Sequence, residues 1–235
     1  MRRLAGMSDS PVLVAAAHGT RDPAGRTVID LLRTAVADRR PDVDVAEAYV
    51  DEDVQQPGLR SVLAGLDEAV VVPVLLSAGY HVHVDVPDAI AGVNRPGVRA
   101  TRPLGPDPVL AEVLADRLAE AGVGDHAVVL AAAGSSDPRA ATDVEQMARL
   151  LAARLGRPVT AAYATASRPS VSESVADLQA AGKSVAIASY LLAPGGFHDR
   201  LRTVGAQVVA APLLPDARLA ELVLRRYDEA LTTAG

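Results

Sequence analysis

The chain contains no cysteine and no tryptophan among its 235 residues, and Lys183 is its only lysine. Without cysteine it can form no disulfide, hold no iron–sulfur cluster and offer no thiolate as a metal ligand or nucleophile. A single lysine leaves little basis for Schiff-base or P-loop chemistry. Any metal ion must therefore be held by imidazole, carboxylate or carbonyl groups.

Positive charge and long apolar runs are also scarce. The net charge of −6 argues against a general nucleic-acid binder, and no apolar run approaches the roughly 20 residues that span a bilayer. Residues Met1–Met7 carry two arginines with no apolar segment behind them, so we expect no signal peptide, and Met7 is an alternative start. The expected location is the cytoplasm, with no membrane or nucleic-acid partner.

What the chain does have is a regular alternation of apolar runs and helical spacing. Val12–Ala17 is a short apolar run that ends in a turn-rich loop, His18–Pro23, and apolar residues at spacings of three and four follow as far as Pro41. The cycle recurs, with strands expected near 43–50, 69–76 and 98–101 and helices near 57–66, 86–91 and 108–121. This order is typical of βαβ units around a parallel sheet.

The pattern then restarts, which indicates an internal repeat. Ala127–Pro138 repeats Val12–Pro23 with a displacement of 115 residues, and the two segments share Gly-x-x-Asp-Pro. A Leu-Leu-x-x-Gly motif recurs at the matching place further on. Any two doubly wound domains look broadly alike, but these shared motifs favour a true repeat.

We therefore predict an α/β protein of two similar doubly wound domains, residues 8–121 and 126–235. Each has a parallel sheet flanked by helices, and the active site lies in a cleft between them.

The strand ends of the first half carry side chains that the second half lacks. His18 follows the first strand where the repeat has Ala133, and Asp51 follows the second strand where the repeat has Thr165; His81 follows the third strand. Carboxyl ends of parallel strands share one edge of a sheet, so His18, Asp51 and His81 should meet. Two imidazoles and a carboxylate suit iron, cobalt, nickel or zinc. We predict a metal site in the first half and a degenerate one in the second.

Other candidate residues have simpler interpretations beside the functional one. Asp51 stands next to two more acidic residues and could belong to a solvated charged run. His83 is a spare ligand or base, or a surface residue, and His198 is expected to face the other half across the cleft. His126 is interpreted as an ordinary loop histidine.

Two motifs together resemble a known family. The segment His18–Pro23, followed by Pro73–Pro87, closely resembles the sirohydrochlorin chelatases, the class II tetrapyrrole chelatases of the sirohaem and cobalamin routes. Ala193–Leu201 resembles the second repeat of the two-domain members. The resemblance implies a lyase that inserts Fe²⁺ or Co²⁺, as a substrate, into sirohydrochlorin without ATP or an organic cofactor.

The resemblance also assigns residues. The family's two histidines fall on His18 and His81, which it makes catalytic and metal-binding. Its acidic metal ligand, usually glutamate, falls on Asp51, whose side chain is one methylene shorter. A neutral imidazole near pH 7 is also a suitable acceptor for the two pyrrole protons that must leave, and which group accepts them stays open.

The implied substrate carries many carboxylates, which arginine binds bidentately, and glycine lets backbone approach a flat ring. A surface salt bridge is the simpler role for each arginine. We predict that the substrate is contacted by residues of the rim loops: Arg21, Gly79, Tyr80, His83, Arg168, Gly195, His198 and Arg200.

Two other functions compete with the chelatase. A metal or tetrapyrrole carrier on the same fold would bind without turnover. A histidine-dependent phosphoryl-transfer enzyme is disfavoured, because such sites have arginine directly before the histidine and this chain has Ala17. The choice between iron, cobalt and nickel stays open. One chain carries both repeats, so a monomer suffices to build the cleft and a homodimer is the alternative.

Overall fold

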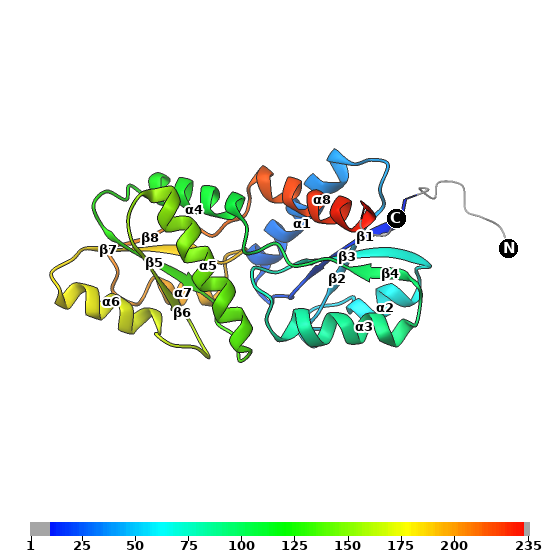
Figure 1. Cartoon of the computed structure of the whole chain (residues 1–235), viewed down its shortest axis with the longest axis horizontal. Helices are drawn as coiled ribbons and strands as arrows, with labels where there is room; N and C mark the ends of the chain where they lie inside the picture. Colours follow the sequence, from blue (N-terminus) through cyan, green and yellow to red (C-terminus); the bar gives the residue numbers. More distant parts are fainter. Residues whose placement is uncertain (1–9, 233–235) are drawn as a thin grey trace.

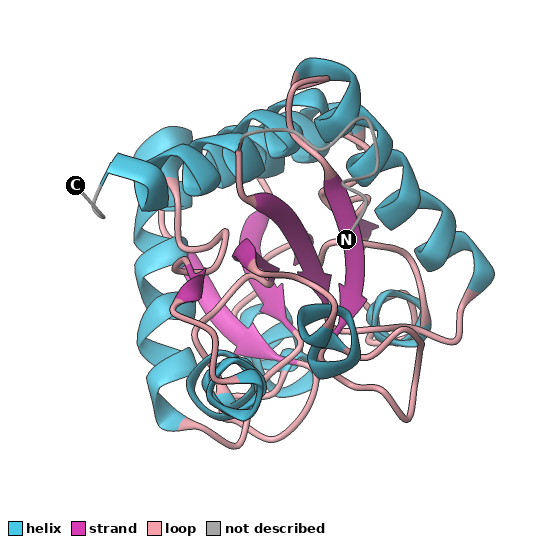
Figure 2. Ribbon diagram, turned by 90° about the vertical axis from the view of Figure 1, so that its right-hand side faces the viewer, coloured by secondary structure: helices cyan, strands magenta, loops and turns pink. Residues whose placement is uncertain are grey.

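The computed structural model describes residues 10–232. Two four-stranded parallel sheets form its framework, with strand orders β2-β1-β3-β4 and β6-β5-β7-β8 (Figure 1). Helices lie on both sides of the strands (Figure 2). The predicted α/β class, with two similar doubly wound units, is thereby confirmed. The alternative start at Met7 lies outside the described residues.

The first half contains both regular helices and one π-helix. Its elements are β1 (Val12–Ala17), α1 (Pro23–Arg39), β2 (Val45–Tyr49), α2 (Leu59–Ala64), β3 (Glu68–Val74), the π-helix η1 (His81–Asp85), α3 (Val86–Val93) and β4 (Gly97–Ala100). The second half and the chain's last helix comprise α4 (Pro108–Glu120), β5 (Ala127–Ala132), α5 (Pro138–Leu155), β6 (Val159–Tyr163), α6 (Val171–Ala180), β7 (Val185–Tyr190), α7 (Gly196–Leu201), β8 (Val208–Val209) and α8 (Ala217–Thr232).

The helix that follows the first strand of each half begins in the same way. Asp22 caps α1 by accepting the Ala24 and Gly25 N–H groups, and Asp137 caps α5 by accepting the Arg139 N–H. In both helices a proline follows the cap at the first helical position, where its missing N–H costs nothing. The shared Asp-Pro of the sequence is therefore a helix-start signal in each half.

The backbone also repeats at the strand ends. The Asp51 N–H donates to the His18 carbonyl at 3.1 Å, and the Thr165 N–H donates to the Ala133 carbonyl at 2.9 Å. These two hydrogen bonds join the same pair of loops in each half. Comparing His18 with Ala133, and Asp51 with Thr165, is therefore a comparison of equivalent positions.

Two helices pack across the predicted division of the chain. α4 packs on α5 and β7, whereas the last helix, α8, returns to the first half and packs on α1 and β3 (Figure 1). One cluster of buried apolar side chains consequently runs through both halves. The ranges 8–121 and 126–235 stay a prediction, and in the folded protein each half borrows a helix from beyond the boundary.

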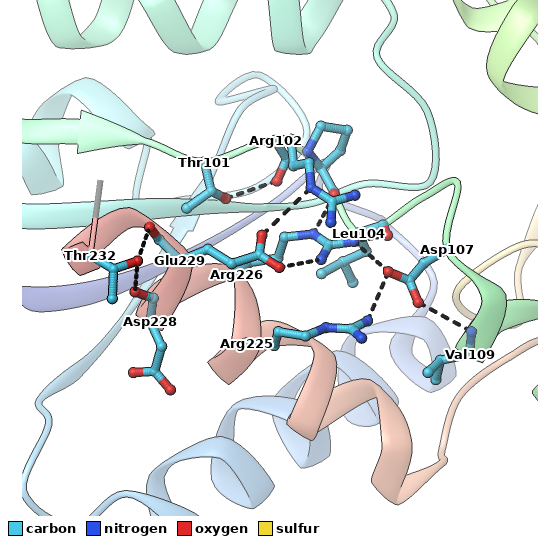
Figure 3. Close-up of polar contacts among 11 residues, drawn as sticks. Thr101, Arg102, Leu104, Asp107, Val109, Arg225, Arg226, Asp228, Glu229 and Thr232 are labelled. Carbon is cyan, nitrogen blue, oxygen red and sulfur yellow. Dashed lines mark hydrogen bonds and ion pairs between the residues drawn. The ribbon is translucent and has the colours of Figure 1, made fainter. Parts of the chain in front are cut away.

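The chain passes between the halves twice, once before α4 and once before α8. An arginine of each of these two helices binds the connecting segment that precedes the other helix. Arg226 of α8 has no exposed surface and donates to the carbonyls of Pro103 and Leu104 at 3.1 and 3.0 Å, and to Asp107 Oδ2 at 2.8 Å (Figure 3). Arg117 of α4 correspondingly donates to carbonyls of the second crossing, those of residues 212, 213 and 215. These contacts tie the two crossings together and hold the halves in one arrangement.

No helix within residues 10–232 is both long enough and apolar enough to cross a membrane.

Candidate active site

A cleft of about 1000 Å³ lies between the two halves and is lined by residues of both. Its walls are the loops that follow β1, β3, β5 and β7, so it sits at the carboxyl ends of the central strands of both sheets, as expected for an open α/β fold. The walls are largely apolar, and its size reaches the upper end of ordinary ligand pockets. The cleft therefore suits a large organic molecule with apolar surface.

The two predicted catalytic histidines meet in this cleft. The ring centroids of His18 and His81 are 4.5 Å apart in an edge-to-face arrangement. His18 is exposed directly after β1, and His81 is the half-buried first residue of η1. Residues 63 positions apart in the chain, His18 and His81, thus form one imidazole pair facing the ligand space.

One nitrogen of each ring, Nδ1, is held by a hydrogen bond. His81 Nδ1 lies 2.5 Å from Asp85 Oδ2, and His18 Nδ1 lies 3.2 Å from the Gly19 carbonyl. Both oxygens accept, so Nδ1 of each ring donates, and neither Nε2 has a hydrogen-bond partner among the described residues. Carboxylate–imidazole contacts of this kind orient metal-binding histidines and increase their basicity.

His81 and Asp85 are four residues apart on η1, a spacing that brings two side chains together on one face of a helix. In η1 the Val86 N–H donates to the His81 carbonyl, five residues back, and the turn is wider than in an α-helix. Asp85 lies one turn beyond His81 on this wide turn, beside its ring. Our sequence analysis missed Asp85, because it expected the helix to begin near residue 86 and so did not use this spacing from His81.

The electrostatic surroundings keep His18 neutral at physiological pH. Partial burial of the ring, followed by the neighbouring His81, lowers the pKa of His18 from its usual value of 6.5; the Gly19 carbonyl and the carboxylates of Asp51 and Asp85 oppose this. The net direction is downward. A neutral imidazole can bind a metal ion or accept a proton.

Asp51, the third predicted ligand, lies near the pair without completing a metal site. It is half-buried after β2, and its carboxylate is close enough to favour protonation of His18. Across residues 10–232, no three histidine or acidic side chains are grouped closely enough to hold an ion. The ligand set of His18, Asp51 and His81 stays a prediction, with the imidazole pair as its assembled part.

Several predicted substrate contacts line the cleft. They come from both halves: Arg21, Gly79, Tyr80, Gly195, His198 and Arg200. Arg21 and Arg200 are exposed, and neither guanidinium has a hydrogen bond or ion pair within the described part of the chain. Both are available for an anionic ligand. Each side of the cleft thus supplies a cation, although the whole chain is acidic.

His198 and Gly79 have structural contacts that the sequence does not reveal. The His198 side chain is buried, with 3% of the residue exposed, and its Nε2 donates to the Ala210 carbonyl at 3.3 Å. Burial lowers the pKa of His198. At Gly79, an added Cβ atom would lie 2.8 Å from Ser135 Oγ, so a side chain there would clash with the other half. Their predicted contact with substrate stays a prediction.

Two further candidates, His83 and Arg168, are not among the residues that line the cleft. His83 is exposed near Asp137 in the other half, where the hydrogen-bonded Arg139 lowers the pKa of that carboxyl to about 2 and His83 makes a minor contribution. Arg168 is exposed and ion-paired with Glu173. Arg168 therefore has the surface salt bridge that the sequence analysis gave as the simpler role for each arginine.

Phe197 is a cleft residue that the sequence analysis did not select. It is 39% exposed, and the Arg200 guanidinium lies 5.3 Å from its ring centroid. Tyr80, on the opposite half, is 50% exposed and also lines the cleft. No other phenylalanine or tyrosine of the described residues is exposed, and both of these rings line the cleft. The rarity of this residue type could have pointed to it, since Phe197 is the only phenylalanine in the sequence.

Comparisons with known proteins identify a family that matches both halves of the chain. The CbiX family model matches residues 12–121 and 127–230. The chain is 29% identical over 199 residues to a sirohydrochlorin cobaltochelatase of Priestia megaterium, covering 78% of this chain and 65% of that protein. It is 31% identical over 156 residues to a sirohydrochlorin ferrochelatase of Bacillus subtilis, covering 61% and 60%. These matches span somewhat less than two thirds of the relatives' lengths.

Solved structures share the fold. SirB from Bacillus subtilis with Fe³⁺ superposes with a TM-score of 0.77 at 22% identity, covering 93% of this chain and 94% of that one. CbiX, described as the terminal enzyme of sirohaem biosynthesis in denitrifying bacteria, gives a TM-score of 0.69 at 21% identity, covering 94% and 99%. With the family model matched over both repeats, the chain belongs to the CbiX family, that of the sirohydrochlorin chelatases which its motifs resemble.

Proposed function

We propose that the protein is a sirohydrochlorin chelatase, which inserts Fe²⁺ or Co²⁺ into sirohydrochlorin for sirohaem or cobalamin synthesis. The observation that carries the proposal is the His18–His81 pair, with both Nε2 atoms free, in a cleft large enough for a tetrapyrrole. The named relatives include both cobalt and iron chelatases. The reaction needs no nucleotide or organic cofactor in this proposal.

The reaction exchanges two protons for one metal ion. Sirohydrochlorin loses its two pyrrole N–H protons, and the divalent ion takes their place between the four ring nitrogens. Imidazole ligands hold such an ion less tightly than thiolates do, so the ion can pass to the macrocycle. Once the ion has left, the neutral imidazole of His18 is free to accept a proton. The two histidines thus serve as metal donors and as proton acceptors.

The cleft positions the macrocycle through both of its sides. The exposed rings of Tyr80 and Phe197 provide apolar surface for the ring system, and Arg21 and Arg200 bind its peripheral carboxylates. All of these residues come from one chain, so we propose that a monomer in the cytoplasm is sufficient, without nucleic acid or membrane.

The direct test is an anaerobic incubation of the protein with sirohydrochlorin and either Co²⁺ or Fe²⁺, followed through the visible spectrum of the macrocycle. We expect metallation faster than in the protein-free mixture with at least one of the two ions. Equal rates with and without protein, for both ions, would contradict the proposal.

The Asp85→Asn variant should insert the metal ion more slowly than the unchanged protein. The amide keeps the size of the side chain but loses the charge that orients His81, and partners of this kind are typically worth about 10–100-fold in affinity or activity. The measurement is the initial rate at saturating substrate, with Asp88→Asn, an exposed acid on α3, as the matched control. An Asp85→Asn rate equal to that of the control would show that Asp85 has no such role.

Arg21→Gln and Arg200→Gln should raise the KM for sirohydrochlorin about tenfold each, because each removes a charge-assisted contact of about 1.4 kcal/mol. The kcat should change little, since neither residue touches the reacting nitrogens in this proposal. Arg168→Gln, which removes the exposed partner of Glu173, is the control and should leave KM unchanged. A KM that does not respond to either rim arginine would exclude them from substrate binding.

The lowered pKa of His18 predicts how Co²⁺ binding depends on pH. Above this pKa, which lies below 6.5, the ring is neutral and His18 adds no pH dependence; below it, protons compete with the metal, and affinity falls by up to about tenfold per pH unit. Titration of the protein with Co²⁺ between about pH 5 and pH 8 measures this component as the part lost in His18→Ala. A His18-dependent decrease centred above pH 6.5 would contradict the direction of the shift.

A further inference from the structure

The segment Leu76–Gly79, here called the strap, leads from β3 to the π-helix that carries His81. Two hydrogen bonds hold it to the other half of the molecule. Tyr190 Oη of β7 donates to the Leu76 carbonyl at 2.7 Å, and Asp143 Oδ2 of α5 accepts the Ala78 N–H at 2.6 Å. The strap therefore belongs to the first half in sequence but is fastened to the second.

The strap also determines where η1 begins. The N–H groups of Val82 and His83 both donate to the Gly79 carbonyl at 3.1 Å, so the last residue of the strap supplies the first acceptor of the turn that contains His81. On its other side Gly79 packs closely against Ser135, whose Oγ would lie 2.8 Å from an added Cβ atom. A displacement of the strap would consequently move His81 relative to His18.

The second half holds the strap of the first half by these two hydrogen bonds, but the residues that would make the reciprocal contact are different. Tyr190 and Asp143 occupy positions whose equivalents in the first half are Val74 and Val28, which carry no polar group. The equivalent of Ala78 is Pro194, which has no N–H to donate. The halves thus differ at both partners of the contact, and within residues 10–232 these hydrogen bonds occur only at the strap that leads to His81.

We infer that Asp143 and Tyr190 are positioning residues, through which the second half sets the distance between His81 and His18 in the metal-donating pair. This inference rests on the proposed function of the pair. It gives the half without a metal site a specific task beyond forming one wall of the cleft. Burial raises the pKa of Tyr190, so its hydroxyl keeps the proton that it donates.

The test measures the affinity of the full-length protein for Co²⁺ alone, by titration, in a series of variants. Asp143→Val and Tyr190→Phe remove one fastening each and should weaken Co²⁺ binding by about 10–100-fold, the usual effect of losing a group that orients a ligand. Asp143→Asn keeps an acceptor for the Ala78 N–H and should bind within about twofold of the unchanged protein, whereas a loss of charge alone would weaken it as much as valine does. Gln146→Val is the control, an exposed residue on the same helix with the same β-branched replacement.

The outcomes distinguish a failure of this inference from a failure of the proposed metal-donating role of His18 and His81. Weak binding in Asp143→Val and Tyr190→Phe, with Asp143→Asn and Gln146→Val near normal, supports the positioning role. Normal binding in Asp143→Val, or equal losses in Asp143→Asn and Asp143→Val, overturns it. His81→Ala is the reference: if this variant binds Co²⁺ as tightly as the unchanged protein, the metal-donating pair itself is wrong.

Discussion

His18→Ala and His81→Ala should each reduce the rate of metal insertion by about 100-fold or more. Each change removes a ring that both delivers the ion and can accept a proton, and proton transfer by a positioned side chain alone is worth about 10²–10⁴-fold. The rings lie 4.5 Å apart and act as a pair, so the double variant should be little worse than either single one. The initial anaerobic rate with Co²⁺ or Fe²⁺ is the measurement.

His126→Ala serves as the control for these two variants. His126 lies just before β5, outside the set of residues that line the cleft, so its loss should leave the rate unchanged. Full activity in both His18→Ala and His81→Ala would refute the assignment of the site. Full activity in only one of them would leave the other ring as the sole metal donor and refute the pair.

Arg226→Leu should lower the free energy of unfolding by about 3–5 kcal/mol, the range for removing one partner of a buried ion pair. Arg226 is fully buried, and its loss deprives Asp107, itself 4% exposed, of one cation and two backbone carbonyls of their donor (Figure 3). The crossing that joins the halves would lose its central contact. Urea denaturation followed by circular dichroism measures the change.

Arg225→Leu is the matched comparison for this effect. Arg225 binds the same carboxylate oxygen of Asp107 at 2.7 Å, but its side chain is 46% exposed, so its loss should cost about 1 kcal/mol or less. A similar loss of stability in the two variants would show that burial of Arg226 is not the source of the effect.

The repeat and the parallel sheets could be predicted because strand and turn signals are local. Val12–Ala17 and Ala127–Ala132 are short apolar runs with the same Asp-Pro helix start behind them, and both became central strands. The packing of α4 and α8 could not be predicted in this way. The order of elements does not specify which of two similar sheets a helix packs against, and the choice depends on contacts such as those of Arg226, 119 residues away from Asp107.

The site residues divide in the same way into those that local sequence signals select and those that depend on contacts between distant parts of the chain. His18 and His81 could be selected because each closely follows an apolar strand whose end must lie at the sheet edge. Asp85 needed the knowledge that helical structure begins at His81 rather than near residue 86, and Asp143 needed knowledge of which helix faces the strap. Arg168 was selected for its charge and its place in a loop, but its partner Glu173 is a residue of α6 and not part of the cleft.

Catalysis of metal insertion by the imidazole pair can be tested by counting the products formed per chain. Under anaerobic conditions, with sirohydrochlorin and Co²⁺ or Fe²⁺ both in large excess over protein, the account predicts many metallated macrocycles per chain, formed faster than in the protein-free mixture. It also predicts that this excess disappears in the His18→Ala, His81→Ala double variant. One metallated macrocycle per chain or fewer, at the protein-free rate, would contradict the account and indicate a carrier.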